Sequence, residues 1–169
     1  MSGKRIYFII SAGMAAILIL SPAAEAAKTR WVTFNSNVLN VQVSVPDDWM
    51  PAKSPKALAF HTDDLTGGTA GIGILKSTSN DKIEELADKE FEREGRPADW
   101  VRSNARLDGM RAIKIVGLVA NNAERKMVQY FVETPKGNYL VQCQATADRW
   151  TTFGPIFATM LSKIKFLAP

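Results

Sequence analysis

Alternating apolar and polar residues predict several strands in the first half of the chain. The clearest example runs from residue 38 to residue 45, where every second residue from Leu39 onward is apolar. A period of two is typical of a strand with one buried face. We also expect strands over 30–34, 58–61 and 69–75. Prolines at three positions predict an irregular stretch from Trp49 through Lys56 instead.

Two hairpins are predicted in the second half. Asp108-Gly109 separates the alternating stretch 101–107 from the β-branched stretch 112–119. This dipeptide favours a tight two-residue turn, because both of its positions need a positive φ. Residues 127–133 and 139–145 predict a second hairpin. Together the two hairpins form a four-stranded antiparallel meander.

Helical spacing of apolar residues appears twice. A stripe from Ile83 to Phe91 ends before Gly95, and the polar cluster 79–81 supplies candidate N-cap residues. A second stripe runs from Phe153 to Ile164. Each helix has one apolar face to bury, and so has the sheet. The sequence therefore predicts an α+β fold, with an antiparallel sheet of about six to seven strands flanked by helices.

The N-terminal segment has the pattern of a secretory signal peptide. Lys4 and Arg5 precede an uncharged apolar run over 6–20, and small residues flank Glu25. We expect cleavage after Ala26, so that residues 1–26 are the signal peptide and 27–169 a single domain. A retained anchor helix is the alternative, although the run is shorter than the roughly 20 residues that span a bilayer.

Charge and cysteine content narrow the function classes. Removal of Lys4, Arg5 and Glu25 with the signal peptide lowers the net charge from +4 to +3. This net charge is small, and the basic residues of the chain are interleaved with acidic ones. Nucleic acid is therefore not an expected partner. The single Cys143 cannot form an internal disulfide, and its place on an apolar strand face predicts a buried, unreactive thiol.

Catalytic motifs are scarce. His61 is the only histidine, and no nucleophile elbow, zinc-binding spacing, phosphate loop or dinucleotide fingerprint occurs. One cluster, His61 with Asp63 and Asp64, has side chains that could hold a divalent metal. The alternative interpretation of this cluster is a polar loop at the end of a strand.

Aromatic residues and glycines suggest binding surfaces. Trp49, Trp100 and Trp150 lie at element boundaries, where they either line a binding surface or pocket or cover the rim of the core. Gly71 and Gly73 share one strand face and allow a close approach. A small apolar ligand held near them, between the sheet and the C-terminal helix, is one hypothesis.

Five short motifs, in this order, resemble the PsbP-like superfamily. They are Val-Pro-Asp-Asp-Trp at 45–49, the helix before Gly95, Leu-Asp-Gly-Met-Arg-Ala at 107–112, Gly-Asn-Tyr-Leu-Val at 137–141 and the segment 153–166. This superfamily includes PsbP of photosystem II, the Ran-regulating Mog-type proteins and the exported bacterial DcrB-related proteins. The resemblance implies an α/β/α-type sandwich and a role in binding or assembly without catalysis.

These observations define the expected function. We expect an exported, non-catalytic binding or assembly protein of the bacterial cell envelope, in the periplasm or secreted. Its partner would be an envelope protein, with no cofactor, no nucleic acid and no membrane segment after cleavage, and the protein would be a monomer. The alternative is a periplasmic protein that binds a small apolar ligand or a metal. An enzyme would have to use His61.

Overall fold

The described residues form two antiparallel sheets. The computed structural model describes residues 29–52, 54, 56–62, 69–95, 97–119 and 122–167. The large sheet has seven strands, in the order β3 (Trp49–Ala52), β4 (Ala57–Thr62), β5 (Ala70–Lys76), β9 (Gly137–Thr146), β8 (Asn122–Thr134), β7 (Met110–Val119) and β6 (Val101–Leu107). The small sheet has three strands, in the order β1 (Trp31–Ser36), β2 (Val41–Pro46) and β10 (Lys165–Phe166).

Both predicted hairpins are present. β6 and β7 pair through a turn at Asp108 and Gly109, whose φ angles of 50° and 74° are the positive values that this turn needs. β8 and β9 pair next to them, and β7 pairs with β8. The predicted four-stranded meander is therefore confirmed, and the sheet continues through β5, β4 and β3 on its other side.

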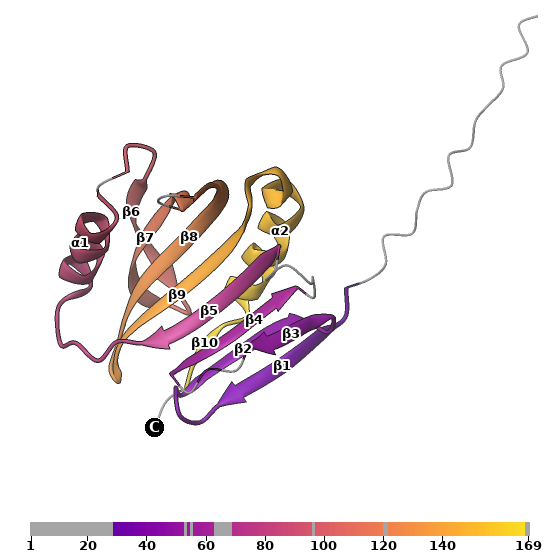
Figure 1. Ribbon diagram of the computed structural model, residues 1–169. Helices are drawn as coiled ribbons and strands as arrows, with labels where there is room; N and C mark the ends of the chain where they lie inside the picture. Colours follow the sequence, from indigo (N-terminus) through magenta and orange to yellow (C-terminus); the bar gives the residue numbers. More distant parts are fainter. Residues whose placement is uncertain are drawn as a thin grey trace, which may run out of the picture.

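Two α-helices lie on opposite faces of the large sheet (Figure 1). α1 (Ile83–Arg93) packs against β7 and β8, and α2 (Trp150–Ser162) packs against β9 and β2. A short 3₁₀ turn at Ala147–Arg149 leads into α2. The α+β fold and the placement of helices on both sheet faces are confirmed. Neither helix of the described residues is long and apolar enough to cross a bilayer.

Two local predictions are wrong, and one feature was not predicted. Of the stretch predicted to be irregular, Trp49–Ala52 is a strand, and an edge strand can accommodate Pro51, whereas Ser54 and Lys56 are in no helix or strand. The N-cap of α1 is Lys82, outside the predicted cluster, and its side chain makes no capping bond. The small sheet was also missed, since the two-residue β10 is too short for any periodic signal.

The alternating pattern of β9 divides the core into two clusters. Tyr139, Val141, Cys143 and Ala145 are buried on the face that α2 and the small sheet cover. The other cluster lies under α1 and contains Ile83 and Ala87, with Trp100 and residues of β7 and β8. Burial of Cys143 is confirmed, and it raises the pKa of this thiol.

Polar contacts join the small sheet to the large one. The Tyr139 hydroxyl donates a hydrogen bond of 2.6 Å to the Leu39 carbonyl. Asp108 accepts one bond of 2.9 Å from the Phe166 backbone N–H and another of 2.8 Å from Lys165 Nζ. The tight turn between β6 and β7 therefore also holds the strand β10.

Candidate functional site

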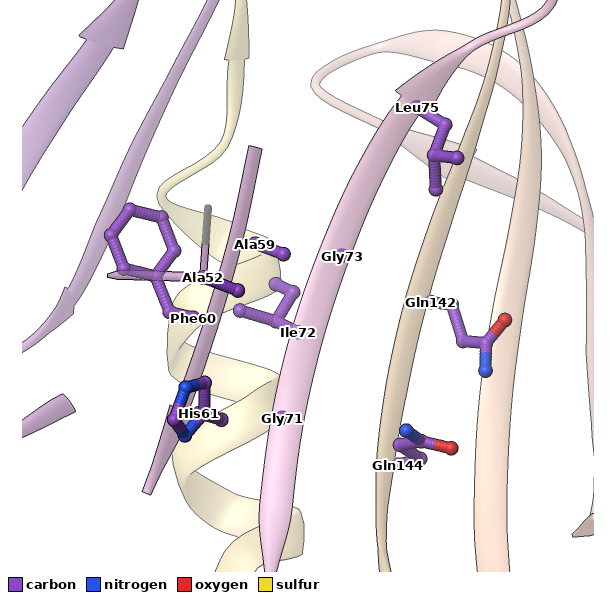
Figure 2. A pocket seen from close by; sticks show the side chains of 10 residues that line it. All are labelled: Ala52, Ala59, Phe60, His61, Gly71, Ile72, Gly73, Leu75, Gln142 and Gln144. Atoms are coloured by element: carbon purple, nitrogen blue, oxygen red, sulfur yellow. The ribbon is translucent and has the colours of Figure 1, made fainter. Parts of the chain in front are cut away.

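An open trough lies on the face of the large sheet that α1 covers only in part. α1 packs mainly against β7 and β8 and reaches β9 only near Leu140, so this face of β4 and β5 and the rest of β9 are not covered by a helix. The trough has a volume of about 270 Å³. Figure 2 shows its lining residues, which are Ala52, Ala59, Phe60, His61, Gly71, Ile72, Gly73, Leu75, Gln142 and Gln144.

Two glycines of β5 form the floor of the trough. A Cβ atom on Gly71 would lie 3.2 Å from the Phe60 carbonyl oxygen, which is tight. On Gly73 it would lie 3.9 Å from Leu75 Cδ1, an ordinary contact. The space above Gly73 is therefore open. Ile72 and Ile74 alternate with the two glycines along β5 and point into the core that α2 covers. Both glycines therefore face away from α2.

His61 lies at one end of the trough (Figure 2). It is opposite Gly71 in the β4–β5 pairing. Its ring Nδ1 lies 3.0 Å from the Thr62 carbonyl oxygen. A carbonyl oxygen can only accept, so Nδ1 carries the proton and donates it. In the neutral ring, Nε2 is then the hydrogen-bond acceptor.

Glutamines form the polar wall of the trough. Gln142 and Gln144 lie on β9, opposite Gly73 and Gly71 respectively. Gln129 of β8 donates through Nε2 to Gln142 Oε1 at 3.1 Å and to Glu90 Oε1 of α1 at 3.0 Å. The amide of Gln142 thus accepts from the sheet interior, and its NH₂ group can donate to a ligand in the trough.

A second hollow continues the trough toward α1. It has a volume of about 420 Å³ and shares Leu75 with the trough. Leu86, Phe131 and Leu140 form its apolar part, and the charged residues of α1 at its rim are Lys89, Glu90 and Arg93. The Glu90 carboxylate accepts a hydrogen bond of 2.7 Å from Arg93. The two hollows together follow β5 and β9 along the open part of the sheet face.

The trough has little catalytic chemistry. None of the described residues that line it is a serine, a cysteine, an aspartate or a glutamate, and His61 is its one ionisable group. Cys143 points to the opposite face, where burial raises its thiol pKa. The trough can therefore offer apolar contact, amide hydrogen bonds and one imidazole, which suit recognition better than bond cleavage.

The structure places one of the three predicted metal ligands at this site. His61 is in the trough, whereas Asp63 and Asp64 lie outside the described residues. The divalent-metal site therefore stays a prediction. Residues 1–26, the predicted signal peptide, also lie outside the described part of the chain.

The three predicted tryptophans are not brought together. Trp49, 5% exposed, and Trp150 both contact Phe157 of α2, with ring centroids 6.0 Å and 5.7 Å away. Trp100, 7% exposed, lies in the other cluster, where its Nε1 donates to the Leu118 carbonyl at 2.7 Å. A binding surface at these tryptophans stays a prediction.

Sequence reasoning found the glycines but not the face on which they act. It expected a ligand between the sheet and the C-terminal helix, and the aromatic residues of α2 and Trp49 pack on that side. The glutamines of β9 were missed. A signal for them was present, since Gln142 and Gln144 occupy the polar positions of an alternating strand that is central in the sheet.

The fold and the trough together define an α+β sandwich domain with an open trough on one sheet face. No protein family model matches the chain, and no curated protein matches its sequence. Solved structures do match. CyanoP, the PsbP of the cyanobacterium Synechocystis sp. PCC 6803, has a TM-score of 0.56 at 16% identity, covering 86% of this chain and 98% of its own.

A second match is Mog1p of Saccharomyces cerevisiae, with a TM-score of 0.53 at 5% identity, covering 83% of this chain and 97% of its own. LpqN of Mycobacterium tuberculosis has a TM-score of 0.49 at 16% identity, covering 80% of this chain and 90% of its own. The matches to CyanoP and Mog1p show that the chain has the PsbP-like fold, as its motifs predict. Similarity at these identities defines the fold alone.

Proposed function

We propose that this chain is an exported, non-catalytic protein that binds a protein partner in the bacterial cell envelope. The observation that carries the proposal is the open trough on the sheet face beside α1. Its floor and one wall are apolar, and His61, Gln142 and Gln144 supply polar groups at its edges. Apolar area with a polar rim is the usual composition of a protein-binding surface.

The shape of the trough favours a protein segment over a small molecule. The trough alone holds about 270 Å³, below the roughly 300–1,000 Å³ usual for small-molecule pockets, and only the adjoining hollow of about 420 Å³ brings the groove into that range. The trough is open to solvent, and the second hollow extends it along β5. A small apolar ligand would stay partly exposed here, whereas an extended segment would cover both hollows.

The chemistry of the trough supports binding without catalysis. An imidazole with no nucleophile or carboxylate among the lining residues is a poor basis for acid–base or covalent catalysis. One protein of the same fold, Mog1p, is described as Ran-binding, which is a binding role. We take over only the general role and not its partner.

Export is supported by the sequence of residues 1–26. The basic start, the apolar run and Ala24-Glu25-Ala26 are the parts of a signal peptide in their normal order. When the full chain is expressed in a Gram-negative host, N-terminal sequencing of the product should begin at Ala27. The product should fractionate with the periplasm. Retention of Met1 in a membrane fraction would contradict export and support an anchor.

Filling the trough tests the binding role. Gly73→Phe adds a ring where a Cβ makes only an ordinary contact, so it should occupy the trough while the protein stays folded. We expect the native protein to capture a partner from an envelope extract, and the variant to lose it. Mass spectrometry of the captured proteins, with cross-linking from a probe at Gln144, measures both outcomes.

The matched control is Val32→Phe, which adds a similar ring on the exposed strand β1. This variant should capture the same partner as the native protein. Equal capture by all three proteins would show that the trough is not the binding surface. Thermal unfolding of each variant checks that loss of capture does not come from loss of the fold.

A further inference from the structure

The two edges of the large sheet differ in how well they are protected. Within the described residues, β3 and β6 each pair with one neighbour only. β3 has four residues and contains Pro51, and both features are common ways to block an edge. β6 has seven residues and no proline, and its side chains from Val101 through Asn104 are exposed. β6 is therefore the edge at which another strand could pair.

The hairpin register identifies the free backbone groups of β6. The two-residue turn makes Leu107 and Met110 the closing pair. In such a hairpin the closing residues exchange both backbone hydrogen bonds, and every second residue repeats this pattern. The N–H and C=O groups of the alternate residues, which are Arg102, Asn104 and Arg106, then point away from the sheet.

The same residues make this edge positively charged. β6 contains Arg102 and Arg106 but no acidic residue, and both arginines lie on the sheet face of α1. Arg102 is paired with the exposed Asp88 of α1. Arg106 donates from Nη1 to the Gly109 carbonyl at 2.8 Å and has no ion pair among the described residues. Its charge is therefore available to an approaching acid.

We propose that β6 accepts an extended segment of a partner protein whose acidic side chains lie four residues apart. One acid would lie opposite Arg102 and the other opposite Arg106, with a polar residue between them opposite Asn104. The two remaining positions point to the other face, opposite Ser103 and Ala105, and suit β-branched residues such as valine. Backbone hydrogen bonds would supply affinity, and the two charge pairs would supply register and specificity.

A second copy of the same chain is a poorer occupant of this edge. Antiparallel pairing of two β6 strands about Asn104 would place Arg102 of each copy opposite Arg106 of the other. Like charges directly opposite each other destabilise a strand pair. The charge pattern therefore selects an acidic strand. This surface is separate from the trough, and the inference does not depend on the function proposed there.

Two peptides of identical composition test the inference. One carries Glu-Val-Thr-Val-Glu between neutral flanks, and the other carries Val-Glu-Thr-Glu-Val between the same flanks. Only the first can place an acid opposite both arginines in one register. Fluorescence anisotropy with the folded protein should give the first peptide an affinity about two- to fivefold higher, because it makes one cross-strand charge pair more than the second. Both sequences are palindromic, so strand direction does not affect the comparison.

Variants of β6 locate the binding surface. Asn104→Pro places a proline where the N–H points outward, so it should block the edge without breaking a bond to β7. Arg106→Glu reverses the charge of the arginine that has no ion pair within the described part of the chain. This variant tests the same edge if Asn104→Pro unfolds the protein. Each should weaken binding of the first peptide about tenfold or more. The control Arg30→Glu, at an exposed site near β1, should bind as the native protein does.

Three results would overturn the inference. Equal affinity for the two peptides would show that charge without register explains binding. Unchanged binding by both β6 variants would place the peptide elsewhere on the protein. Sedimentation that shows a dimer, with the dimer lost in Asn104→Pro, would show that the edge serves self-association instead.

Discussion

The two faces of the large sheet are built from the same strands but differ in how fully their side chains are buried. Every second residue of β9 from Tyr139 to Ala145 is buried on the α2 face, where aromatic rings of α2 and Trp49 complete the packing. On the α1 face, Leu140, Gln142 and Gln144 are only half-buried. One strand can thus contribute to the packed core on one side and, as we propose, to recognition on the other, because successive side chains point to opposite faces.

The difference between the faces comes from how each helix is attached. α2 presents Phe153, Phe157 and Met160 as buried residues, so apolar contact holds it. α1 buries only Ile83 and Ala87, and exposed ion pairs such as Arg111 with Glu84 surround it. Exposed ion pairs contribute little to stability. We therefore expect the α1 face to be the less stable one, and three predictions test this difference.

The largest effect is expected on the α2 face. Phe157→Ala removes a ring that is 2% exposed and contacts Trp49, Trp150 and Phe153. Deleting a buried aromatic side chain leaves a cavity and should lower the free energy of unfolding by about 3–5 kcal/mol. Urea denaturation followed by tryptophan fluorescence measures the loss. The control Gln144→Ala, on the other face of β9, should change stability by less than about 1 kcal/mol.

A smaller and more local effect is expected on the α1 face. At Gly117 of β7, a Cβ atom would lie 2.2 Å from Trp100 Cδ1, so Gly117→Ala must displace that ring. Trp100 packs edge-on against Phe91 of α1, with ring centroids 5.1 Å apart. We expect a loss of about 1–3 kcal/mol, as is usual when a packed site is overfilled.

Hydrogen exchange separates this local effect from global unfolding. In Gly117→Ala, amides of α1 should lose protection while those of α2 keep it. Ala substitution at Gly154 of α2, where a Cβ would lie 3.8 Å from Trp150 Nε1, is the matched control and should leave α1 unchanged. Equal loss of protection in both helices would contradict two separately stabilised faces.

The smallest effect is expected at the start of α1 and depends on pH. Hydrogen bonds from Lys89 and Ser79 lower the pKa of the exposed Asp81 carboxyl below its ordinary value. Because this pKa is lower in the folded than in the unfolded state, its stabilising contribution is present above the unfolded value of about 4 and is lost as pH falls below it. Thermal unfolding should show a smaller decrease between pH 5 and pH 2 for Asp81→Asn than for the native protein. Identical dependence of the unfolding temperature on pH in both proteins would show that the Asp81–Lys89 pair does not contribute to stability.

The sequence predicted the elements well and their spatial relations less well. Alternation and the Asp108-Gly109 turn were enough for the meander, since hairpin partners are adjacent in the chain. The pairing of β10 with β2 joins residues more than a hundred positions apart, and no local pattern encodes it. The trough was missed for the same reason: it exists because α1 covers β7 and β8 and not β5, which the apolar stripe of a helix does not specify.

The hydrogen bonds that Asp108 accepts from β10 have a consequence for the order of folding. The Asp108 carboxylate lies in the turn between β6 and β7, which can form early because its strands are adjacent in the chain. It accepts hydrogen bonds from the Phe166 backbone N–H and from the Lys165 side chain. Phe166 also packs against Tyr139, with ring centroids 5.0 Å apart. The small sheet lacks its third strand until residue 166 has left the ribosome. Under the export that we propose, such a delay would keep the domain incomplete, and so transportable, for almost the whole of its synthesis.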